Sequence, residues 1–246
     1  MLDLTLRTQV LERDENGYNQ WRVVTRRESL AADETALLIC DVWDGHRCKG
    51  AVERMEAMVP RMEQVVKAAR AKSVLIVHSP SGMLDFYEGT PARQRALDAP
   101  RVEPPEPVER EDPPMPVDAS DRGSDTDETE TYRPRTRQHP GIEIQDEDVI
   151  SDDGEEIYSF MQQQGIENLI IMGVHTNMCI LNRSFGIKQM VRWGVNMMLV
   201  RDLTDAMYNP AMPPYVSHSE GTQLVIEYIE KFWCPSISSD DLLDGS

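Results

Sequence analysis

Four short apolar runs without polar alternation constrain the fold of this chain more than any other feature. The runs are Ala36 to Val42 (ALLICDV), Ser73 to Ser79 (SVLIVHS), Asn168 to Val174 (NLIIMGV) and Asn196 to Asp202 (NMMLVRD). Continuous apolar runs of this length are typical of strands that are buried on both faces of a parallel sheet. They therefore predict four central parallel strands.

Amphipathic segments separate these runs along the chain. They cover residues 51–72, 154–165 and 181–194, and the last two end at Gly165 and Gly194, which suit a helix C-terminus. The resulting β-α-β order predicts an α/β fold, a doubly wound, Rossmann-like sheet with right-handed crossovers. Binding sites in such sheets lie beyond the carboxyl ends of the strands.

Two further segments lie outside this pattern. Alternating runs at residues 4–11 and 20–26 flank an Asn16-Gly17 turn signal, so residues 1–33 are predicted to form an N-terminal β-hairpin extension of the domain at 34–246. Residues 98–130 hold seven of the sixteen prolines, with twelve acids and three arginines. This composition predicts a solvated surface loop, and its length leaves open a lid or a contact with a partner chain.

The bulk composition narrows the function. A net charge of −18 argues against nucleic acid or an anionic membrane as partner, so we expect a small-molecule substrate. The sequence contains no signal-like N-terminus and no apolar run of membrane-spanning length, which predicts a cytoplasmic protein. The four cysteines are too scattered for a disulfide framework or a structural zinc site.

One of these cysteines occupies a chemically favourable position. Cys179 follows the strand at 168–174 and precedes a helical segment, where unpaired backbone N–H groups are expected to lower its thiol pKa. Such a thiolate is a nucleophile, and Asp41, at the end of the first apolar run, could accept its proton. The alternatives are a buried structural cysteine and an aspartate that caps a loop.

These segments resemble the isochorismatase-like cysteine hydrolases, which include nicotinamidases and N-carbamoylsarcosine amidases. The similarity covers roughly residues 34–240 and lies in ALLICDVWD, GIENLIIMGVHTNMCI and GVNMMLVRDLTDA. It implies a six-stranded parallel sheet flanked by helices, with its last strand near PSISS, and a homo-oligomer. It also implies Cys179 as nucleophile, Asp41 as base, backbone N–H groups near Met178 and Cys179 as oxyanion hole, and a cis peptide between Val174 and His175.

The chain departs from this family at one position. The family completes its catalytic triad with a lysine from the region between the second strand and the cysteine, but no lysine occurs between Ser73 and Ile187. Arg137 is the arginine closest to the following strand and is predicted to supply the charge, although it cannot transfer protons as lysine can. The alternative is a catalytically silent binding or assembly relative.

Several residues near the strand ends are predicted to contact the substrate: Trp43, His46, His78, His175 and Met178. Nicotinamidases bind zinc through an Asp-x-His pair after the second strand, and VHSPSGMLDF lacks it. Asp44 and His46 have the same spacing after the first strand, which leaves a metal-assisted amidase as a third hypothesis. We predict no metal and no other cofactor, because no phosphate-binding glycine motif occurs either.

Overall fold

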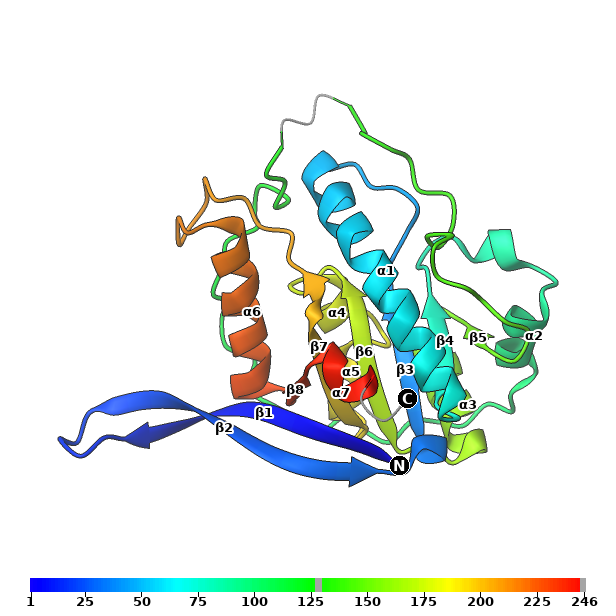
Figure 1. Cartoon of the computed structure of the whole chain (residues 1–246), viewed down its shortest axis with the longest axis horizontal. Helices are drawn as coiled ribbons and strands as arrows, with labels where there is room; N and C mark the ends of the chain where they lie inside the picture. The colour runs from blue at the N-terminus through cyan, green and yellow to red at the C-terminus, as the bar shows by residue number, and fades with distance from the viewer. Residues whose placement is uncertain (127–129, 244–246) are drawn as a thin grey trace.

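The computed structural model describes residues 1–126 and 130–243, which build one eight-stranded sheet in the order β2-β1-β8-β7-β6-β3-β4-β5 (Figure 1). The strands are β1 (Leu2–Arg13), β2 (Asn19–Leu30), β3 (Thr35–Cys40), β4 (Leu75–Ser79), β5 (Val149–Ile150), β6 (Asn168–Val174), β7 (Asn196–Asp205) and β8 (Ser236–Ile237). The six strands from β8 to β5 are all parallel. The predicted fold class is thereby confirmed, including a last strand within PSISS.

The helices lie on both faces of this sheet. They are α1 (Lys49–Ala71), α2 (Pro91–Asp98), α3 (Gly154–Gln164), α4 (Cys179–Asn182), α5 (Ile187–Arg192), α6 (His218–Phe232) and α7 (Ser239–Leu243), with 3-10 turns at Ala32–Glu34 and Leu84–Tyr87. Alternate residues of β3 point to opposite sides: Leu37 and Ile39 meet α1, whereas Ala36 and Leu38 meet α3, α5 and α6. The apolar runs are therefore strands buried on both faces, as their pattern predicts.

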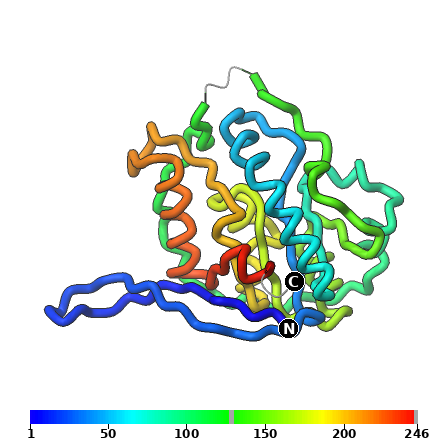
Figure 2. The backbone as a smooth tube through the Cα atoms, in the orientation of Figure 1, coloured from blue at the N-terminus to red at the C-terminus, as the bar shows by residue number. Residues whose placement is uncertain are grey.

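The N-terminal hairpin extends the same sheet. β1 and β2 pair along all twelve residues, and β1 also pairs with β8 through Arg7 and Ser236. Leu2, Leu4 and Leu6 are buried, and α7 lies beside β1 where the described chain ends (Figure 2). The root of the hairpin is thus part of the domain core, while its turn projects beyond α6 (Figure 1).

The acidic segment follows the surface in an irregular path. Its described part covers 98–126 and residue 130, whereas residues 127–129 lie outside the described residues. Asp112 accepts hydrogen bonds from Tyr228 and Lys188 on α6 and α5, and Asp125 binds both terminal nitrogens of Arg54 on α1, at 2.6 and 3.1 Å. The segment is therefore tied to the domain by ion pairs, in addition to being exposed as predicted.

The carboxyl ends of β3 and β6 meet in a tight backbone crossing. Gly173 has φ of 121°, and a Cβ there would lie 2.1 Å from the carbonyl oxygen of Cys40, so only glycine fits. The next residue after β3, Asp41, has φ of 53°. This left-handed turn ends the strand and directs the Asp41 side chain toward the end of β6. None of the described helices is long and apolar enough to cross a membrane.

Candidate active site

Asp41 and Cys179 meet at this edge of the sheet, as predicted. The Asp41 carboxylate is fully buried, and its Oδ1 accepts a hydrogen bond from the backbone N–H of Ser81 at 2.8 Å. The thiol of Cys179, on the first turn after β6, is hydrogen-bonded to the same carboxylate. The thiol predicted as nucleophile and the carboxylate predicted as base are therefore in contact.

The positive charge beside this pair comes from Arg183. Its Nε and Nη2 donate to Asp41 Oδ2 at 3.1 and 3.0 Å, which leaves its Nη1 facing away from the carboxylate. Arg183 caps the single turn of α4 that begins at Cys179, so the two side chains leave the same turn of backbone. Sequence reasoning missed this residue, although its spacing of four from Cys179 is typical of side chains that share a helix face.

The predicted Arg137 does not occupy this place. Its guanidinium lies over the ring of Phe86, 5.3 Å from the centroid, and its backbone is bonded in both directions to Asp44. These and neighbouring bonds hold the loop from residue 133 to 137 against the β3–α1 connection. Arg137 was selected because it is the arginine nearest in sequence to the next strand, but its guanidinium lies over Phe86. The arginine beside Asp41 is Arg183.

The predicted lowering of the Cys179 pKa is wrong. Burial, first, and then the charge and hydrogen bond of Asp41 raise the pKa of this thiol to about 12, while Arg183 and a backbone hydrogen bond from His175 act in the opposite direction. The helix that was expected to stabilise the thiolate has four residues, too few for a substantial dipole. At neutral pH the resting Cys179 side chain is therefore a thiol.

The family resemblance implies an oxyanion hole in the backbone around Cys179. The peptide between Val174 and His175 is cis. The N–H of Met178 donates to the carbonyl oxygen of His175 at 3.0 Å, as does that of Ile180 at 3.2 Å. The N–H of Cys179 has no such acceptor among the described residues, so it is the group of this turn that is available to an oxyanion.

Trp43, His46 and His175 also come together, but they fill the space between them. The Trp43 ring stacks on His46 at 6.4 Å between centroids, His46 lies 4.9 Å from His175, and the guanidinium of Arg135 covers Trp43 at 4.3 Å. Burial and the neighbouring His46 lower the pKa of His175 to about 3, so its ring is neutral at neutral pH. The void that these rings share with Asp41 measures about 10 Å³, the room of a single water molecule.

An open hollow lies on the other side of Cys179. It has a volume of about 380 Å³ and is lined by Asn177, Met178, Cys179, Asn182 and Arg183. Met178, a predicted substrate-binding residue, is among the residues that line this hollow. Neither Trp43 nor His46 lines this hollow.

His78 is placed away from the substrate. Its side chain is fully buried, with Nδ1 3.1 Å from Gln138 Oε1 and Nε2 3.1 Å from Asp148 Oδ2. Arg70 also binds Asp148, so this ring belongs to a network that ties β4 and α1 to the chain before β5. Its predicted substrate contact is wrong, because its position before the end of β4 turns the ring into the protein.

The Asp44–His46 spacing does not produce a metal site in the described structure. The Asp44 carboxylate accepts hydrogen bonds from the backbone N–H groups of Thr136 and Arg137, at 2.7 and 3.2 Å, and His46 Nδ1 accepts one from the N–H of Cys48 at 3.2 Å. Among residues 1–126 and 130–243, no three His, Cys, Asp or Glu side chains group closely enough to hold a metal ion.

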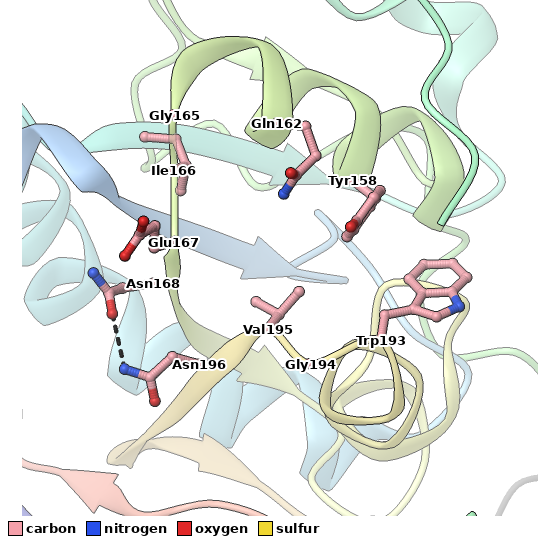
Figure 3. Close-up of a pocket in the computed structure, with 10 residues that line it drawn as sticks. All are labelled: Tyr158, Gln162, Gly165, Ile166, Glu167, Asn168, Trp193, Gly194, Val195 and Asn196. Atoms are coloured by element: carbon pink, nitrogen blue, oxygen red, sulfur yellow. Dashed lines mark hydrogen bonds between the residues drawn. The ribbon is translucent and has the colours of Figure 1, made fainter. Parts of the chain in front are cut away.

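A second sizeable cavity lies at the opposite end of the sheet. It measures about 420 Å³, and Figure 3 shows Tyr158 and Gln162 of α3 pointing toward Val195 across it, with Trp193 at one side. Asn168 and Asn196, the first residues of β6 and β7, form its floor and are hydrogen-bonded at 2.8 Å. Because Cys179 follows the carboxyl end of β6, this cavity cannot serve its chemistry.

Comparison with solved structures agrees with the predicted resemblance. The structure of a cysteine hydrolase from Pseudomonas syringae pv. phaseolicola 1448A matches 88% of this chain and 94% of its own, with a TM-score of 0.57 and 15% identity. The chain has the isochorismatase-like fold. An isochorismatase from Pseudomonas putida KT2440 matches with a TM-score of 0.52 and 13% identity, over 87% of this chain and 92% of its own.

A third similar structure is an isochorismatase family protein from Burkholderia thailandensis. It has a TM-score of 0.50 and 14% identity, and the match covers 86% of this chain and 96% of that protein. No protein-family model and no curated protein sequence matches the chain. At such low identity these similarities establish the isochorismatase-like fold, and the chemistry of the site has to be argued from its own residues.

Proposed function

We propose that this protein is a cysteine hydrolase that cleaves a C–N bond in a small amide or a related compound. The observation that carries the proposal is the direct contact between the Cys179 thiol and the buried Asp41 carboxylate, next to an open hollow. Burying a carboxylate costs free energy unless it is paired, and Asp41 is held beside the thiol by Arg183 and by the N–H of Ser81. A carboxylate positioned in this way supports a role in chemistry.

In the first half of the reaction, Cys179 sulfur attacks the substrate carbonyl carbon while its proton passes to Asp41. The oxyanion that forms accepts a hydrogen bond from the backbone N–H of Cys179. The C–N bond then breaks, and the proton moves from Asp41 to the leaving amine, which departs and leaves a thioester on Cys179. Because the proton transfer accompanies the attack, a high resting pKa of the thiol is compatible with catalysis.

In the second half, a water molecule attacks the thioester. Asp41 accepts a proton from this water, the carboxylic acid is released, and the proton returns to the sulfur of Cys179. Both halves thus use the same carboxylate as base and then as acid. Arg183 balances the charge of Asp41 through its two hydrogen bonds but keeps its own proton throughout, unlike the lysine of the related enzymes.

The proposal is tested by screening turnover of small amides, carbamoyl compounds and vinyl ethers. Cys179→Ala is the control for the nucleophile, and intact-protein mass spectrometry of quenched reactions detects an acyl group on Cys179. We expect release of ammonia or an amine by the parent and none by the variant. If the protein cleaves vinyl ethers but not amides, the bond that it breaks is C–O, and the proposed C–N substrate class is wrong.

The alternative is a binding protein without turnover. It is favoured by the absence of a proton-donating lysine and by the raised pKa of Cys179. In that case compounds from the same panel bind and raise the melting temperature, but neither product nor acylated Cys179 accumulates. Those two readouts together separate a silent relative from a hydrolase whose substrate has been missed.

A further inference from the structure

The cavity at the amino ends of β6 and β7 has no part in the proposed reaction, because Cys179 follows the opposite end of β6. Its volume of about 420 Å³ lies within the range of small-molecule sites, about 300–1,000 Å³. It is bordered by α3 and by the two connections that lead into β6 and β7 (Figure 3). We call it the amino-end cavity. Its side chains indicate which kind of ligand it can hold.

The amino-end cavity carries one negative charge. Of the 10 residues drawn around it in Figure 3, only Glu167 is charged. Glu167 is exposed, and in the described parts of the chain its carboxylate forms no ion pair. Arg192, which precedes the lining residue Trp193, lies instead over the ring of Trp233, 5.4 Å from its centroid. A carboxylate without a counter-ion at the wall of a cavity favours a positively charged ligand.

The pair of amides at the floor of the cavity offers a hydrogen-bond acceptor. Asn168 is buried, and its Nδ2 donates at 3.3 Å to the backbone carbonyl of Glu34, a group that can only accept. Asn168 Oδ1 therefore accepts the hydrogen bond from Asn196 Nδ2 at 2.8 Å. This order fixes the orientation of the second amide. Within the described structure Asn196 Oδ1 has no donor of its own, so it can accept a hydrogen bond from a ligand.

The other side of the cavity is aromatic. The ring of Tyr158 is buried and meets the ring of Trp193 edge-on, at 5.6 Å between centroids. Figure 3 shows these two rings at one side of the cavity, Glu167 and the two asparagines at the other, and Val195 between them. The lining thus has an apolar half and a half with a negative charge and an acceptor. A ligand that suits both halves has an aromatic body and a positively charged N–H group.

We propose that the amino-end cavity binds a small arylalkylamine, that is, an aromatic ring joined by a short chain to a primary ammonium group. The ammonium group binds the carboxylate of Glu167, with Asn196 Oδ1 as a further acceptor on that side. The ring packs against Tyr158, Trp193 and Val195. This site is separate from Cys179, so the proposal does not depend on the proposed hydrolase activity.

Other classes of small molecule match the lining less well. An anion would meet Glu167 and the net charge of −18 of the whole chain. A neutral aromatic alcohol would gain nothing from the charge of Glu167. An aliphatic diamine would bring a second positive charge to a cavity with one carboxylate, and it would have no ring to place beside Tyr158 and Trp193.

The test is isothermal titration calorimetry of the full chain with phenethylamine at neutral pH and low salt. Two probes of similar shape isolate the charge: 2-phenylethanol has none, and 3-phenylpropionate has the opposite sign. We expect phenethylamine to bind at one site about fivefold more tightly than 2-phenylethanol, and 3-phenylpropionate not to bind. No saturable binding of phenethylamine at millimolar concentration overturns the proposal. Equal affinity for phenethylamine and 2-phenylethanol overturns the role of the charge.

Two pairs of variants locate the site. Glu167→Gln should weaken phenethylamine binding to the affinity of 2-phenylethanol, whereas Glu155→Gln, which removes an exposed carboxylate on α3 outside the cavity, should leave it unchanged. Trp193→Ala should weaken both probes and Trp193→Phe less so, with circular dichroism confirming that each variant is folded. Equal effects of Glu167→Gln and Glu155→Gln, or full binding by Trp193→Ala, place the amine elsewhere on this acidic chain and overturn the assignment of the cavity.

Discussion

Replacing Asp41 by asparagine should make Cys179 more reactive toward alkylating agents, although Asp41 is the proposed base. The Cys179 thiol has its pKa raised from 9.0 to about 12, and after burial the main causes are the charge of Asp41 and its hydrogen bond. Asparagine keeps the shape of the side chain and removes the charge. Arg183 then stands beside the sulfur without a competing carboxylate.

The size of the effect follows from these causes. At pH 8, a pKa of about 12 leaves roughly one thiol in ten thousand as thiolate. Burial remains in the variant, so we assign to Asp41 a change on the order of one pKa unit, about 1.4 kcal/mol. Iodoacetamide should therefore modify Cys179 about tenfold faster in Asp41→Asn than in the parent, while any turnover is lost.

The assay is the rate of carbamidomethylation between pH 7 and 9.5, followed by peptide mapping. Cys40, Cys48 and Cys234 are buried, so Cys179 is the accessible cysteine, and Cys179→Ala gives the background. Asp44→Asn is the matched control, because it removes a neighbouring carboxylate that does not contact the thiol. If Asp41→Asn reacts at the parent's rate or more slowly, Asp41 does not control the thiol and the proposed pair is refuted.

Three further predictions concern neighbouring groups. Arg183→Ala should slow alkylation of Cys179 several-fold, because Arg183 lowers the pKa of this thiol, and Arg183→Lys should slow it less. Arg137→Ala should leave the dependence of the alkylation rate on pH unchanged, because Arg137 lies over Phe86. Asp125→Asn, which removes a part-buried bidentate ion pair, should lower the free energy of unfolding in urea by about 1–3 kcal/mol. In the folded protein the pKa of His175 is lowered to about 3, so as the pH falls the unfolded chain takes up this proton first. The free energy of unfolding should therefore decrease between pH 6.5 and 3. His175→Gln should remove up to about 5 kcal/mol of this pH dependence.

The parts of the fold that were predictable are those where one local pattern has one structural solution. Runs such as NLIIMGV cannot be placed at a surface, and their order along the chain fixes parallel pairing with crossovers. The hairpin followed from alternation around Asn16-Gly17. His78 shows the limit, because one residue along a strand reverses the side chain from the site into the interior.

The chemistry of the site was harder to predict because it depends on distances between segments far apart in sequence. Cys179 and Asp41 were correctly placed at neighbouring strand ends. The same proximity on which the proposed catalytic pair rests raises the thiol pKa instead of lowering it. A helix dipole can be estimated from sequence, but burial and the nearest charge outweigh it here.

In the proposed mechanism, Arg183 takes the place of the lysine that the family resemblance implies. Arg183 leaves the same turn as the nucleophile, four residues after Cys179, and binds Asp41 through two nitrogens. Its place beside the pair is thus set by local backbone geometry, and the loop at 133–137 is free to cover Trp43 and anchor on Asp44. Because a guanidinium keeps its proton at any physiological pH, the proposed mechanism assigns all proton transfer to Asp41. That is why the opposite responses of alkylation and turnover to Asp41→Asn are the sharpest signature of the proposed mechanism.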